Sequence, residues 1–140
     1  VWTFSPRRME TLGPDTRRKA FEFIDGTGLI LGTDIFEAMK AGFGYAGVTG
    51  AGMTMSKSDV DTIIFLSDGL PYLRPEVREK GVADPDKILE QIREWNKRAK
   101  VILHTIQISA DAGGGKKGDA KGVKFMKQLA EENGGTHVQR

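Results

Sequence analysis

Residues 62–66, read as TIIFL, constrain the fold more than any other part of the chain. Side chains alternate between the two faces of a strand, so an unbroken run of apolar or β-branched residues predicts a strand that is buried on both faces. Strands of this kind are typical of a parallel sheet that helices cover on both sides. The run stops at Ser67, Asp68 and Gly69, which places an acid at the C-terminal end of the strand.

Helix and strand patterns alternate along the rest of the chain. Asp15, Asp34 and Asp84 each precede apolar residues at helical spacing, and we expect each to cap a helix. The helix after Asp84-Pro85 has the clearest apolar stripe, formed by Ile88, Leu89, Ile92 and Trp95. Residues 101–109 predict a second strand, and residues 136–139 predict a last short strand after one more helix.

This alternation predicts a single α/β domain over residues 1–140. A chain of 140 residues is long enough for one core but not for two. Helices between successive strands imply crossover connections, so we expect a mostly parallel sheet with helices on both faces.

Composition excludes several classes of protein. Hydrophobic residues make up 39% and charged residues 29%, which is ordinary for a globular domain and predicts no membrane span in this chain. The net charge is +2 and basic residues are mixed with acidic residues along most of the chain, so we expect no nucleic-acid partner. One lysine cluster departs from this mixing and is interpreted as a solvated helix face, namely Lys116, Lys117, Lys121, Lys124 and Lys127. Because the chain has no cysteine, it has no disulfide, thiolate nucleophile or cysteine-bound zinc.

Asp68 and Thr33 are the candidate site residues. Ligands of open α/β sheets bind at the carboxyl ends of the strands, where Asp68 is expected to lie. Thr33 and Asp34 precede a helix and offer a hydroxyl and a carboxylate, which are oxygen ligands of the type that Mg²⁺ prefers. Each has a structural alternative: Ser-Asp-Gly is a common turn, and Thr33 or Asp34 is a suitable helix cap.

Four segments, taken in order, resemble a von Willebrand factor type A domain: GTDIFEA at residues 32–38, TIIFLSDGLP at 62–71, HTIQI at 104–108 and FMKQLAEENGG at 125–135. The resemblance covers nearly the whole chain and implies a Rossmann-like, doubly wound fold with a metal-ion-dependent adhesion site. In such a site, Mg²⁺ or Mn²⁺ bridges the domain to an Asp or Glu of a partner protein. Thr33 matches the family's loop threonine, a direct or water-mediated metal ligand, and Asp68 matches its strand-end acid, which usually holds the metal through water.

The chain departs from the family in one motif. The family's first strand ends in Asp-x-Ser-x-Ser, which supplies two hydroxyl ligands and a second carboxylate. The nearest string here, TMSKS at residues 54–58, lacks the acid and precedes a strand. Residues 1–5 resemble the family's second strand, so we expect the domain to be incomplete at its N-terminus and its metal site to be partial.

These patterns favour a non-enzymatic protein-interaction module with a partial metal site. One alternative is a metal-assisted hydrolase or phosphoryl-transfer enzyme that uses Asp68, although no nucleophile and base form a convincing pair in the sequence. Another alternative is a scaffold domain whose metal site is degenerate. His104 shares a strand face with Ile102 and Ile106 and is expected to be a hydrogen-bonded core residue rather than a ligand.

Overall fold

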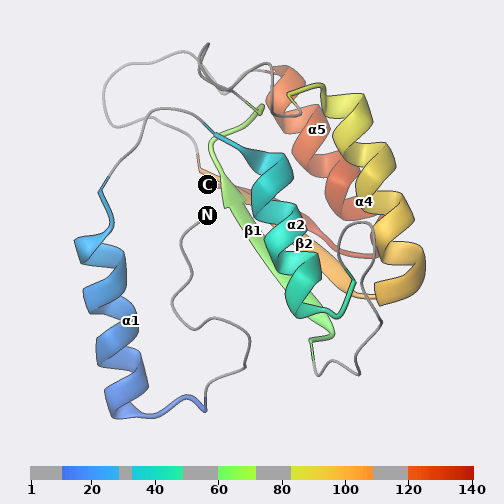
Figure 1. Cartoon of the computed structure of the whole chain (residues 1–140). Helices are drawn as coiled ribbons and strands as arrows, with labels where there is room; N and C mark the ends of the chain where they lie inside the picture. The colour runs from blue at the N-terminus through green and yellow to red at the C-terminus, as the bar shows by residue number, and fades with distance from the viewer. Residues whose placement is uncertain (1–10, 29–32, 49–59, 72–82, 109–119) are drawn as a thin grey trace. The chain divides into compact units, whose positions relative to one another are not determined.

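The computed structural model describes residues 11–28, 33–48, 60–71, 83–108 and 120–140. The chain divides into two compact units, Val1–Leu31 and Gly32–Arg140. Helix α1 (Pro14–Gly26) belongs to the first unit. The described part of the second unit contains three helices and three strands (Figure 1): α2 (Ile35–Tyr45), β1 (Thr62–Ser67), α4 (Pro85–Ala99), β2 (Ile102–Gln107), α5 (Ala120–Glu131) and β3 (His137–Gln139).

Helix α1 begins at Pro14, with Gly13 in the N-cap position and no side-chain cap. The prediction that Asp15 caps this helix is wrong, because proline has the backbone angle of a first helical residue and the helix starts there. Asp15 lies in the first turn, where the helix dipole favours an acid. None of the residues of α1 is buried.

The predicted caps of α2 and α4 are confirmed. The Asp34 carboxylate accepts a hydrogen bond from the backbone N–H of Glu37 at 3.0 Å, and that of Asp84 accepts one from Asp86 at 3.0 Å. The predicted apolar stripe of α4 is also buried: Ile88, Leu89, Ile92 and Trp95. These boundaries follow from local hydrogen bonds, which is why the sequence predicts them.

The three strands form a parallel sheet in the order β1-β2-β3. In Figure 1 the strands run from the lower to the upper end of this unit, and α2, α4 and α5 run back down. The carboxyl ends of the strands and the N-terminal ends of the helices therefore lie at the same end. The predicted α/β class and the parallel pairing are confirmed for the described strands.

One face of the sheet carries the core. Leu103 of β2 is fully buried, and Ile63 and Phe65 of β1 pack against the same cluster of side chains from α2, α4 and α5. Trp95 lies at the centre of an aromatic group, with its ring centroid 5.5 Å from that of Phe36 and 5.7 Å from that of Phe43. Burial of these rings on one side holds α2 and α4 together over the strands.

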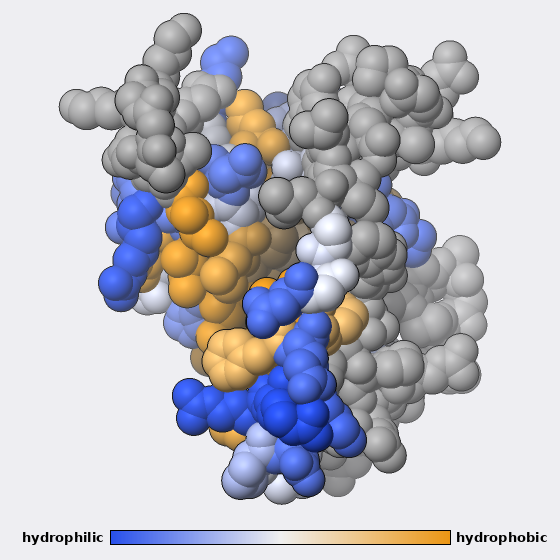
Figure 2. Space-filling model, turned by 90° about the vertical axis from the view of Figure 1, so that its left-hand side faces the viewer, coloured by the Kyte–Doolittle hydropathy of each residue, from blue (hydrophilic) through white to orange (hydrophobic). Residues whose placement is uncertain are grey.

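On the other face of the sheet, here called the open face, no described helix of the second unit packs. Its apolar side chains are exposed by 60% at Ile64, 54% at Leu66, 44% at Ile102 and 42% at Val138. Figure 2 views the molecule from the left-hand side of Figure 1, and hydrophobic residues are visible on that side. This exposure differs from the predicted burial of both faces, because the described helices of this unit pack on the side of Leu103.

Candidate functional site

Asp68 lies in the turn that follows β1. The residue is exposed, whereas its neighbours Ser67 and Gly69 are buried. The Ser67 hydroxyl accepts a hydrogen bond from the backbone N–H of Gly69 at 3.3 Å, and Gly69 has φ of +151°, a backbone angle that favours glycine. The turn therefore holds its backbone against the protein and presents the Asp68 carboxylate to solvent.

Two neighbouring elements, β2 and α5, contact the backbone of the Asp68 turn. From β2, the fully buried Gln107 donates a long hydrogen bond of 3.4 Å from Nε2 to the backbone oxygen of Asp68. From α5, Gly122 lies against Gly69, and a Cβ on Gly122 would be 3.1 Å from the Gly69 Cα. The absence of a side chain at Gly122 thus lets the first turn of α5 approach the backbone beside Asp68.

Thr33 directly precedes Asp34, the N-cap of α2. The N-terminal end of α2 lies at the end of the unit where the strands terminate (Figure 1). It is half-buried and belongs to a β-bridge. Because the side chain of Asp34 caps α2, this helix does not require the Thr33 hydroxyl as its cap. The structural alternative is therefore confirmed for Asp34, and the metal-ligand prediction for Thr33 stays a prediction.

Thr33 and Asp68 offer oxygen atoms, and their donor types fit a hard cation such as Mg²⁺ or Mn²⁺. They are two ligands of a set that normally has six, several of them water molecules. In the part of the chain that the structure describes, no group of three or more His, Asp or Glu side chains is placed to hold a metal ion. The metal site at Thr33 and Asp68 therefore stays a prediction.

Gln107, Ser67 and Gly122 are the site residues that sequence reasoning missed. The available signal was the pair of polar residues Thr105 and Gln107, which lie on the same face of β2 as the buried Leu103. The partner of Gln107 is 39 residues away in the chain, so no local pattern indicates the contact.

The two histidines lie on neighbouring strands but on opposite faces of the sheet, because His137 pairs with Thr105 and not with His104. His104 Nδ1 accepts a hydrogen bond from the backbone N–H of Thr136 at 3.1 Å. The prediction that His104 is hydrogen-bonded is confirmed. The prediction that it is a core residue is wrong, since it is half-buried on the open face.

Other candidate motifs add no ligand site. The Gly-x-Gly-x-x-Gly string at residues 42–47 begins within α2, so it does not connect a strand to a following helix as dinucleotide binding requires. Of the lysine cluster, Lys121, Lys124 and Lys127 are exposed on α5, and Lys116 and Lys117 lie outside the described residues. Residues 1–5 and 54–58 also lie outside them.

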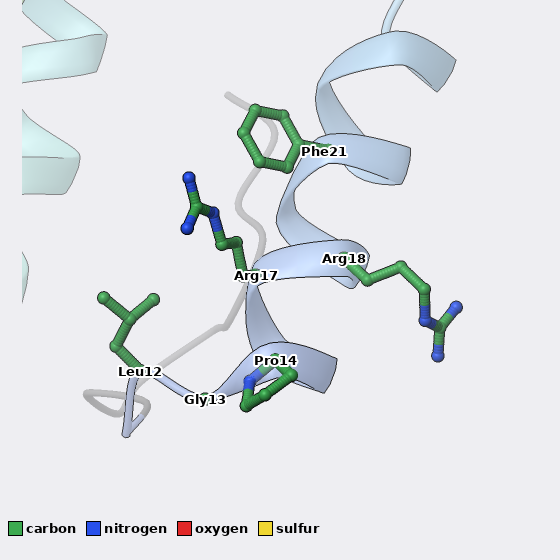
Figure 3. Close-up of a pocket in the computed structure, with 6 residues that line it drawn as sticks. All are labelled: Leu12, Gly13, Pro14, Arg17, Arg18 and Phe21. Carbon is green, nitrogen blue, oxygen red and sulfur yellow. The ribbon is translucent and has the colours of Figure 1, made fainter.

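A hollow of about 540 Å³ lies against α1 in the first unit. Figure 3 shows Arg17 and Phe21 on the side of Leu12, with Arg18 pointing away. The Arg17 guanidinium carbon is 5.9 Å from the centre of the Phe21 ring, the geometry of a cation–π contact. Among the described residues, its lining has no acid or histidine and includes neither Thr33 nor Asp68.

Across the described residues, no helix has both the length and the apolar composition needed to cross a membrane. Comparison of the chain with protein-family models, with curated proteins and with solved structures gives no match.

Proposed function

We propose that the chain is a non-enzymatic protein-interaction module of the von Willebrand factor A type, with a Rossmann-like fold. Thr33 and Asp68 contribute oxygen ligands to a partial Mg²⁺ or Mn²⁺ site. The partner is a protein that presents an Asp or Glu side chain. When the cation is bound, it links the carboxylate of the partner to the domain by completing its coordination with oxygen from both proteins.

One observation carries this proposal: the exposed Asp68 carboxylate follows directly on β1, at the carboxyl edge of a parallel sheet, in a turn whose backbone is held. Ligands of α/β sheets bind at this edge because loops and helix N-termini converge there. The hydrogen bonds of Ser67 and Gln107 hold the backbone of the turn and do not involve the carboxylate of Asp68. With respect to these two bonds, both carboxylate oxygens can bind a cation or a water molecule bound to it.

Thr33 supports the proposal in a second way. The resemblance assigns a metal-binding hydroxyl to this position, and Asp34 beside it already caps α2. The capping role and the ligand role therefore belong to different residues. This division lets the Thr33 hydroxyl bind a cation without loss of the helix cap.

Calorimetric titration of Mn²⁺ and Mg²⁺ into the chain tests the proposal. We expect saturable binding that Thr33→Ala and Asp68→Ala each weaken by about tenfold or more, the range found when groups that support a metal site are removed. Thr11→Ala and Asp25→Ala are matched controls, because both residues are exposed and lie outside the candidate site. The controls are expected to bind the cation as the unchanged chain does.

Three results would contradict the proposal. Absence of binding in a folded sample would support the scaffold alternative with a degenerate site. Binding that is indifferent to Asp68→Ala would place the cation elsewhere. Cation-dependent hydrolysis of a phosphoester such as p-nitrophenyl phosphate, lost in Asp68→Asn, would instead support the metal-assisted enzyme.

A further inference from the structure

Two buried polar atoms on the covered face of the sheet have no hydrogen-bond partner among the described residues: Oε1 of Gln107 and Nε2 of His137. Gln107 is fully buried, and both residues lie beneath α5. An unsatisfied buried polar atom destabilises the folded state, so native proteins seldom leave two of them close together.

The neighbouring hydrogen bonds indicate whether each unsatisfied atom is a donor or an acceptor. The Thr105 hydroxyl donates its single hydrogen to the backbone oxygen of Met126 at 2.9 Å. It must therefore accept from His137 Nδ1, which lies 2.9 Å from it. In the neutral ring this places the hydrogen on Nδ1 and leaves Nε2 as an acceptor.

Gln107 presents the same requirement. Its Nε2 faces the carbonyl oxygen of Asp68 at 3.4 Å, which assigns the donor end of the amide to that side. The remaining oxygen is an acceptor. Both unsatisfied atoms therefore need a hydrogen-bond donor, and neither of them can supply it to the other.

The strand register brings the two acceptors near each other. Thr105 pairs with His137 and Gln107 pairs with Gln139, so His137 and Gln107 are diagonal neighbours on one face. Gly69 lies at the donor end of the amide, where a Cβ built on it would be 3.8 Å from Gln107 Nε2. The acceptor Oε1 is at the other end of the planar amide.

We propose that Gln107 Oε1 and His137 Nε2 bind one internal water molecule beneath α5. Water is small and neutral and has two donor hydrogens, one for each acceptor, and buried waters typically make two to four such bonds. The bound water would connect β3 to Gln107, and Gln107 connects in turn to the Asp68 turn. This water does not depend on a bound metal, although Gln107 also contacts the turn of Asp68.

Nuclear magnetic resonance of the whole isotope-labelled chain tests this site. Long-range ¹H–¹⁵N spectra should show His137 protonated on Nδ1 alone. Water-selective cross-relaxation should reach the carbon-bound protons Hε1 of His137 and Hγ of Gln107, with the sign of a long-lived water. Carbon-bound protons are used because they do not exchange with solvent.

Gln107→Met removes the acceptor at nearly constant length, and the water signal at His137 is expected to disappear. Gln128→Met is the matched control: Gln128 lies on α5, and its amide donates a hydrogen bond to the exposed Glu132 at 2.8 Å. The control should retain the signal. The proposal is overturned if the folded, unchanged chain shows no water contact at either residue, if His137 is protonated on Nε2, or if Gln107→Met keeps the full signal.

Discussion

Gly135 shows how a single residue decides whether β3 can dock. A Cβ at this position would lie 2.0 Å from the backbone oxygen of Leu103 and 2.5 Å from its carbonyl carbon. Leu103 belongs to the central strand and its side chain is fully buried, so its backbone cannot move aside without disturbing the core. The glycine is required here for close approach of two backbones.

We therefore expect Gly135→Ala to lower the free energy of unfolding by about 3 kcal/mol or more, at the upper end of the cost of overpacking. Urea denaturation followed by circular dichroism measures the change. Gly28→Ala is the control, since nothing lies within 4 Å of a Cβ built there. Equal stability of the two variants would show that β3 does not pack on β2 as described.

At the scale of the element, α4 is the clearest case of a helix defined by its own sequence. Asp84 caps it, Pro85 begins it, and Lys97 and Arg98 lie in its last turn, where the dipole favours cations. Lys100 ends it with φ of +56°, and the Asn96 side chain binds the backbone N–H of Val101 at 2.8 Å. Start and end are thus both secured by local hydrogen bonds.

Loss of this cap gives a quantitative prediction. Asp84→Ala should reduce stability by about 1 kcal/mol, whereas Asp84→Asn should cost only a few tenths, because asparagine caps helices about as well as aspartate. Thermal or urea denaturation of the two variants measures the difference. An equal loss in both would mean that the charge of Asp84, rather than its hydrogen bond to Asp86, supports the helix.

At the scale of the whole second unit, the two faces of the sheet differ in burial, and stability measurements can detect the difference. Leu103 is fully buried, so Leu103→Ala should cost about 2–5 kcal/mol. Ile64 is 60% exposed, so Ile64→Thr, which keeps the β-branched shape, should cost less than about 1 kcal/mol. A cost for Ile64→Thr close to that of Leu103→Ala would show that the open face is covered in solution.

The sequence by itself determined the local features of this protein. The capping residues Asp34 and Asp84, the apolar stripe of α4 and the existence of all three strands were predictable, because each depends on neighbours within about one helical turn or one strand. The N-cap of α1 was predicted at Asp15 but lies at Gly13, so this prediction was wrong by two residues.

Only the tertiary structure decided which strand face is open and how the Asp68 turn is held. Residues 62–66 are apolar throughout, so their pattern contains no information about which face the helices cover. Gln107 meets Asp68 across 39 residues, and Gly122 meets Gly69 through the packing of α5. Such contacts depend on strand pairing and helix placement, which follow from burial of the whole core rather than from any short stretch of sequence.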